Sequence, residues 1–176
     1  AWGTPSKPII NTAGSGTKCW IVGGLTGSVY NDGEKSYLQS PCFDFTSLQH
    51  PFISFLLYRE SEWKFDGGNL QYSLDQGITW ANVGSFNDAV DCMNDNWYNY
   101  SPITYLTAPL ATVRDGWCGN SLANSTESGV ACQGGHGSLG WVTAKHCMQN
   151  LAGKPNVIFR FTFAAGTTCN HFDGLA

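Results

Sequence analysis

The chain has 176 residues and a formal net charge of −4 at pH 7. Its nine lysine and arginine residues are not clustered, which argues against binding to nucleic acid or to an anionic lipid surface. No apolar run is long enough to span a bilayer, so membrane insertion is not expected. Charged residues make up 12% of the chain, against about 25% in a typical domain, which favours a β-rich protein with many uncharged polar loops.

Period-two patterns predict β-strands along most of the chain. We expect them at residues 18–22, 37–43, 52–58, 70–75, 79–84, 111–117, 140–146, 156–163 and 172–176. The clearest is 156–163, where Val157, Phe159 and Phe161 face one way, whereas 52–58 is apolar on both faces, as in a central strand. Turn signals, such as 31–33, 66–68 and 134–135, separate the strands. With no convincing amphipathic helix, the pattern predicts one all-β domain over residues 1–176, built as an antiparallel β-sandwich.

Residues 73–80 fit the Asp-box pattern S-x-D-x-G-x-T-W, beginning at Ser73. We expect the Asp75 carboxylate to accept hydrogen bonds from backbone N–H groups of the turn, Gly77 to adopt a positive φ, and Trp80 to pack back over the hairpin. Sialidases and other β-propellers carry several such runs at blade spacing, and one blade needs roughly 40 to 50 residues. A single copy therefore predicts a structural hairpin in a sandwich.

The cysteines favour disulfides over zinc, because none of them forms a C-x-x-C pair. Their number also favours an oxidising compartment, so we expect a secreted or cell-surface protein. Seven cysteines leave at least one unpaired within the chain, and their spacing does not determine the connectivity. Only a Cys118–Cys132 bridge is locally plausible, because these residues bracket the polar segment 119–131. Closing that loop would contribute about 3 kcal/mol in the chain-entropy model.

Several runs occur in the order seen in one group of secreted modules. They are residues 2–5 (WGTP), 15–20 (SGTKCW), 25–27 (LTG), 40–45 (SPCFDF), 66–73 (DGGNLQYS), 140–144 (GWVTA) and 172–176 (FDGLA). In these runs the chain resembles jelly-roll β-sandwich modules of secreted and surface proteins of Bacteroidetes, including type IX-secreted proteins. Those modules are related in fold to MAM domains, reelin subrepeats and carbohydrate-binding modules.

The resemblance implies a jelly roll whose terminal strand normally continues beyond Ala176. The start at Ala1 and the stop within an apparent strand likewise suggest a fragment of a longer secreted protein. Modules of this kind adhere, bind glycans or space other domains, and the fold alone does not decide among these roles.

The chain departs from that group in a loop-rich insertion at about residues 85–139. Variable loops on a rigid sandwich commonly hold binding sites. We expect flat rings to stack on sugars there and polar side chains to bind hydroxyl groups. The candidate ligand-binding residues are Trp97, Tyr98, Tyr100, Trp117, Asn94 and Asp95. The alternative interpretation is that these aromatic side chains hold the long loops against the sandwich.

Similar jelly rolls often hold a structural Ca²⁺, which prefers oxygen ligands. The resemblance implies that Glu34 and Asp173 occupy the positions closest to that site, with Asp32 and Asp66 as further candidates. Alternatively, these are exposed turn carboxylates. Zinc is less favoured, because the histidines at 136, 146 and 171 lie on different segments without paired-ligand spacing.

We therefore expect a non-catalytic extracellular accessory module that binds a polysaccharide or glycan and is joined to other domains of its parent protein. The alternative is a protein-adhesion or spacer domain. A remote alternative is a hydrolase that uses Glu60 and Glu62 as acid and base. However, that pair is also what a polar strand end shows, and no G-x-S-x-G, P-loop or Cys/His protease signature is present.

Overall fold

The protein is all-β over the residues that the computed structural model describes, 1–27, 29–122 and 124–176, apart from one 3₁₀ turn, Gln149–Leu151. The strands are β1 (Trp2–Gly3), β2 (Cys19–Trp20), β3 (Lys35–Phe43), β4 (Phe52–Leu57), β5 (Arg59–Glu60), β6 (Gly67–Ser73), β7 (Ala81–Asn82), β8 (Asn124–Glu127), β9 (Val130–Gln133), β10 (Val142–Cys147), β11 (Val157–Ala164) and β12 (Gly174–Leu175). The all-β prediction is confirmed. No described helix has the length and hydropathy needed to cross a bilayer.

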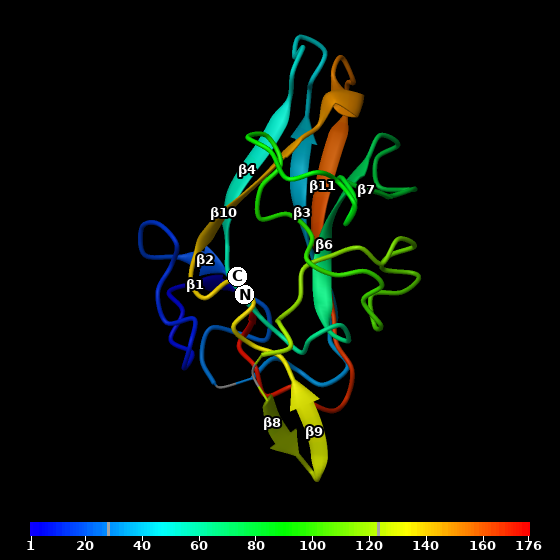
Figure 1. Ribbon diagram of the computed structural model, residues 1–176. Coiled ribbons are helices and arrows are strands. Elements are labelled where there is room, and N and C mark those ends of the chain that lie inside the picture. Colours follow the sequence, from blue (N-terminus) through cyan, green and yellow to red (C-terminus); the bar gives the residue numbers. More distant parts are fainter. Residues whose placement is uncertain (28, 123) are drawn as a thin grey trace.

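The main strands form two antiparallel layers. The larger sheet has the order β3-β11-β6-β7, and β4 pairs with β10 in the second. In Figure 1, β4 and β10 lie to the left of the larger sheet, and the small β8–β9 hairpin projects at the bottom. Two further short ladders join β1 to β2 and β5 to β12. This arrangement is that of a β-sandwich; the jelly-roll connectivity stays a prediction.

The apolar core lies between the two layers. It unites Leu57 of β4 and Ala144 of β10 with Leu70 of β6 and Phe159 of β11, all buried. The alternation predicted at 156–163 is observed in β11, where Val157, Phe159 and Phe163 are buried in apolar clusters. Burial of these side chains from both layers drives the sheets together.

The expectation that 52–58 forms a central strand is wrong. This segment is β4, whose only strand partner among the described residues is β10. Its outer face remains accessible, with Phe52 and Leu56 exposed to 57% and 38%. The apolar residues on both faces therefore reflect one core face and one accessible face.

The predicted insertion supplies a large part of the core. Trp97 and Tyr98 are each 7% exposed and Trp117 is 1% exposed. The ring of Trp117 lies 5.7 Å from that of Phe55 on β4 and 6.5 Å from that of Phe161 on β11. It lies closer still to the rings of Trp97 and Tyr98, at 5.1 and 4.8 Å. These side chains fill the space between the sheets, so the insertion is an integral part of the sandwich.

Gly67 admits this segment to the larger sheet, and Gly68 admits the neighbouring strand β11. The sequence predicts a turn at 66–68, but Gly67 and Gly68 begin β6, and the Gly68 and Trp117 backbones exchange hydrogen bonds of 3.0 and 2.8 Å. A Cβ on Gly67 would lie 2.2 Å from the Trp117 carbonyl oxygen, and one on Gly68 would lie 2.0 Å from that of Thr162. Only glycine fits these two close backbone approaches, one to Trp117 and one to Thr162 of β11. Of the predicted 111–117 strand, Gly116 and Trp117 alone form β-bridges among the described residues.

The expected Cys118–Cys132 bridge is not formed. Cys132 is bonded to Cys169, with a Cα–Cα distance of 5.4 Å, and Cys118 is a buried free thiol. The segment predicted to be a loop, 119–131, contains most of the β8–β9 hairpin. This hairpin places Cys132 beside the segment that follows β11, where Cys169 lies. The Cys118 sulfur instead accepts hydrogen bonds from Lys64 N and Asn99 Nδ2, and burial raises the pKa of this thiol to about 11.

We predict that Trp117→Ala lowers the free energy of unfolding by about 3 to 5 kcal/mol, because it leaves a cavity between the sheets. Urea unfolding followed by circular dichroism measures this change. Trp2→Ala is the control, since Trp2 is 51% exposed and its removal should cost about 0.5 kcal/mol or less. Equal losses in both variants would contradict the assignment of Trp117 to the core.

Candidate functional site

An open groove of about 400 Å³ lies between the two layers, along β3 and β4. Leu38, Phe55 and Phe161 are half-buried apolar residues in its wall. At its rim, Trp141 is half-buried and Trp20 is 49% exposed. Ligand sites of this size are commonly apolar with a few polar groups at the margin, so the groove is the strongest candidate site.

The edges of two strands contribute to this groove. Consecutive residues line it on both sides, 36–38 from β3 and 55–57 from β4. Because side chains alternate between faces, consecutive lining residues indicate that a strand edge, and not only one face, borders the groove. Among the described strand pairings, β3 pairs only with β11 and β4 only with β10.

Ala176 pairs with Tyr58, the residue that directly follows β4. Ala176 N donates to Tyr58 O at 3.1 Å, and Tyr58 N donates to Ala176 O at 2.9 Å. Ala176 also borders the groove, as do Ala1 and Ile21, whose backbones are joined by a hydrogen bond. Residues from both ends of the chain and from several segments between them thus meet here, and no local sequence signal brings them together.

The predicted sugar-binding residues do not form an exposed surface. Asn94 is 7% exposed and its side chain donates to Ala89 O at 2.7 Å, while Asp95 pairs through its backbone with Lys145 of β10. Tyr100 is half-buried and lies 5.7 Å from the ring of Trp63. With Trp97, Tyr98 and Trp117 in the core, these positions favour the alternative interpretation, in which the side chains hold the insertion in place.

The carboxylates predicted to bind Ca²⁺ accept hydrogen bonds from the protein itself. Asp173 Oδ2 accepts from Ile9 N and Ile10 N at 2.7 and 2.5 Å. Asp66 accepts from Tyr30 Oη and Gly166 N at 2.6 and 2.8 Å. Among the described residues, the four predicted ligands do not form a group of close metal ligands; they are Asp32, Glu34, Asp66 and Asp173.

The other two carboxylates make local contacts. Asp32 accepts from Asn170 Nδ2 and Glu34 accepts from Asn31 Nδ2, at 2.9 and 2.8 Å. A buried ammonium lies near the pair predicted from the resemblance, because Lys7 Nζ donates to Asp173 O at 2.7 Å. Burial lowers the pKa of Lys7, against the opposing effect of Asp173 and Glu34. A Ca²⁺ at this place stays a prediction.

The turn at 73–80 has the contacts expected of it. Asp75 Oδ1 accepts from Thr79 N at 2.9 Å and from Ser73 Oγ at 2.7 Å. Hydrogen bonds from Thr79, followed by that from Ser73, lower the pKa of Asp75 to about 2. Gly77 has a φ of +91°, and Trp80 Nε1 donates to its carbonyl at 3.0 Å. The residues of this turn are engaged with one another, which fits a structural role.

The acidic pair considered for hydrolysis is buried away from the groove. Glu60 and Glu62 are 3% and 7% exposed, and neither lines the groove. Burial, assisted by the charge of Asp66, raises the pKa of Glu62 to about 8. Glu60 Oε1 accepts from His136 N at 2.5 Å. Buried acids without substrate access do not support an acid–base pair.

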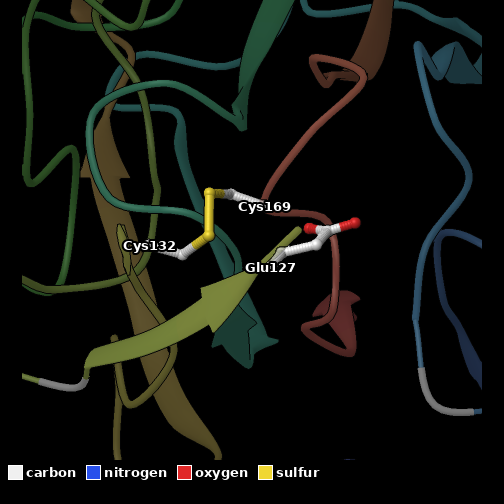
Figure 2. Close-up of side chains that lie close together, drawn as sticks. All are labelled: Glu127, Cys132 and Cys169. Atoms are coloured by element: carbon white, nitrogen blue, oxygen red, sulfur yellow. A yellow bond between two sulfur atoms is a disulfide. The ribbon is translucent and has the colours of Figure 1, made fainter. Parts of the chain in front are cut away.

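A second candidate site joins the β8–β9 hairpin to the segment that follows β11. Figure 2 shows Glu127 beside the Cys132–Cys169 disulfide. Ligand atoms of these three residues lie within 4.8 Å of one another, the one such group found among the described residues. The sequence gives no local signal for it, because 37 residues separate the two cysteines.

Comparison with known proteins adds no relative: no family model matches the chain, and no curated protein matches it.

We predict that the stability of the protein falls as the pH rises from about 5 to about 8. The folded-state pKa of Glu62 is raised to about 8, above the value of about 4.3 expected in the unfolded chain. The folded state therefore binds more protons in this range, and unfolding becomes easier as they are lost. Urea unfolding at several pH values measures the slope. Glu62→Gln should flatten it, and an identical slope in that variant would contradict the assignment.

Proposed function

We propose that the chain is a non-catalytic module of an extracellular protein and that its groove binds an extended polypeptide segment of a partner protein. The observation that carries this proposal is the apolar groove bordered by the edges of β3 and β4. A strand edge offers rows of backbone donors and acceptors, which an added strand can pair with. An extracellular location is supported by the Cys132–Cys169 disulfide.

The backbone of β4 indicates on which side a partner strand can pair. Tyr58 directs its N–H and C=O groups to Ala176, on the side away from β10. In an antiparallel strand these groups alternate between the two sides with a period of two. Leu56 and Ser54 should therefore direct their backbone groups to the same open side, where a partner segment would continue the antiparallel pairing.

The side chains of the groove define the chemistry of the partner. An extended segment places alternate side chains on one face, and that face would lie against Phe55, Leu38 and Phe161, all half-buried. Burying the remaining apolar surface favours association by about 25 cal/mol per Å² before the cost of ordering the segment. We therefore expect a segment with small or branched apolar residues at alternate positions.

Glycan binding is a second candidate, favoured by the exposed rings beside the groove. Trp2 and Trp20 are 51% and 49% exposed, and their ring centroids lie 5.3 Å apart. Exposed indole rings stack on the apolar faces of sugars, and Lys18 and Ser15 at the same rim offer polar contacts. This candidate keeps the polysaccharide partner expected from the sequence but moves its site out of the insertion.

Strand binding is tested with a synthetic peptide of alternating valine and threonine, flanked by lysines to keep it soluble. We predict that Ser54→Pro weakens its binding about tenfold, because losing one edge hydrogen bond costs about 1 to 1.5 kcal/mol. Ser54→Ala is the matched control, since it keeps the backbone N–H. Calorimetry gives the affinity, and amide shifts along β3 and β4 locate the peptide.

Proline should be tolerated at this edge position, and thermal melting checks that the variant is folded. Equal peptide affinity in both variants, shifts confined to other strands, or no binding by the wild type would contradict the strand-binding proposal.

For the glycan candidate, we predict that Trp20→Ala weakens polysaccharide binding about 10- to 100-fold, as the loss of a stacked aromatic contact does. A glycan array first names a ligand, and affinity electrophoresis then compares the variants. Phe86→Ala is the control, because Phe86 is 41% exposed and lies in the insertion. A larger loss in Phe86→Ala than in Trp20→Ala would return the site to the insertion, and an array without a hit would eliminate this candidate.

A further inference from the structure

The Cys132–Cys169 pair lies beside a carboxylate that is held in place from outside the disulfide. Glu127 is on β8 and pairs with Val130 of β9, two residues before Cys132. Its Oε2 atom accepts from Asn170 N at 3.0 Å and lies 3.2 Å from His171 Nδ1. Both of these contacts with described residues use Oε2. The structure thus brings two sulfurs and one oxygen together in a fixed frame.

Contacts other than the disulfide hold the two sides of this cluster together. Asn170 follows Cys169 directly, and its side-chain nitrogen donates to Asp32 Oδ1 at 2.9 Å and to Gly166 O at 2.8 Å. Its backbone N–H binds Glu127 on the hairpin. The segments carrying Cys169 and Cys132 should therefore stay adjacent when the bond between the sulfurs is cleaved.

The donor set has the chemistry of a zinc site. Zn²⁺ binds thiolate sulfur at about 2.3 Å and carboxylate oxygen at about 2.0 to 2.2 Å, in tetrahedral geometry. Such bonds separate neighbouring ligand atoms by roughly 3.3 to 3.8 Å, and the atoms of this cluster already lie within 4.8 Å. The side chains of Glu127 and His171 are 33% and 29% exposed, which gives an ion a route to the buried sulfurs.

We propose that this cluster is a redox-dependent Zn²⁺ site, with Cys132, Cys169 and Glu127 as ligands in the reduced protein. A dithiol reductant supplies two electrons and two protons: the S–S bond breaks, each sulfur becomes a thiol, and the reductant becomes a disulfide. Zn²⁺ then forms two Zn–S bonds and releases the two thiol protons to solvent. Water completes the fourth position, and His171 orients the carboxylate, as outer-shell partners of metal ligands do. A disulfide oxidant reverses the sequence: it accepts two electrons from the two thiolates and two protons from solvent to become a dithiol, the Cys132–Cys169 bond forms again, and Zn²⁺ is released.

The test measures Zn²⁺ binding by calorimetry before and after reduction. A phosphine reductant replaces the dithiol, because it competes less for the ion. Reduced wild type should bind one more Zn²⁺ per chain than the oxidised protein and than the Cys132→Ser/Cys169→Ser variant. That variant is a matched control, because it retains the same five other cysteines. Co²⁺ in place of Zn²⁺ should give a tetrahedral thiolate spectrum only in the reduced wild type.

Single substitutions distinguish a Zn²⁺ site that includes Glu127 from binding by the two cysteine thiols alone. Glu127→Gln and His171→Ala should each lower the Zn²⁺ affinity of the reduced protein about 10- to 100-fold, and only Glu127→Gln should change the Co²⁺ spectrum. Both variants keep the cysteines, so melting of their oxidised forms checks the fold. Unchanged affinity in both, equal stoichiometry in the double-serine variant, or no Zn²⁺ uptake on reduction would each overturn the proposal.

Discussion

The fold depends on the packing of Trp117 between the two sheets. The second sheet has only two main strands, β4 and β10, and cannot cover the larger sheet by itself. Trp97, Tyr98 and Trp117 complete the core, and each polar atom of these rings has a backbone partner: Val83 O at 3.0 Å, Leu70 O at 2.9 Å and Asn96 O at 3.3 Å. Large aromatic side chains with one satisfied polar atom combine extensive burial with defined orientation. The described part of the segment between β7 and β8, residues 83–122, is thus held by the core that it helps to form.

A polar network covers the outer face of the larger sheet over β6 and β11. Arg160 Nε donates to Gln71 Oε1 at 2.8 Å, and Arg160 and Gln71 both donate to Leu110 O. Asn69 binds carbonyl oxygens of the same 107–115 segment, and the Arg160 guanidinium lies 4.1 Å from the ring centroid of Trp80. Buried polar groups are tolerated when their hydrogen bonds are made. The network covers β6 and β11, whereas Tyr37 of β3 remains 60% exposed, so β3 is the open edge of this sheet and it borders the groove.

Local sequence patterns predicted strands and turns, whereas contacts between distant residues determined how these elements pair and which residues meet at the candidate sites. The alternation in β11 and the chemistry of the turn at Asp75 are contained within a few residues, so the sequence was sufficient there. By contrast, Gly67 and Gly68 have the composition of a turn, and only the close approach of Trp117 to Gly67 and of Thr162 to Gly68 explains them as strand residues. The partner of Cys132 lies 37 residues away, and the groove combines residues from both ends of the chain. Neither has a periodic signal, because the fold alone creates the proximity.

The same reasoning explains why the aromatic residues of the insertion misled the search for a site. Rings outside any strand pattern suggest exposure only if the loops that carry them stay on the surface. Here Gly67 of β6 leaves room for the Trp117 backbone, which pairs with Gly68, and that pairing places the ring of Trp117 in the core. The exposed indole rings beside the groove are those of Trp2 and Trp20, on the short β1–β2 ladder. A ring that stabilises the core is unavailable to a ligand, so recognition by this protein depends on the strand edges and rings that the packing leaves uncovered.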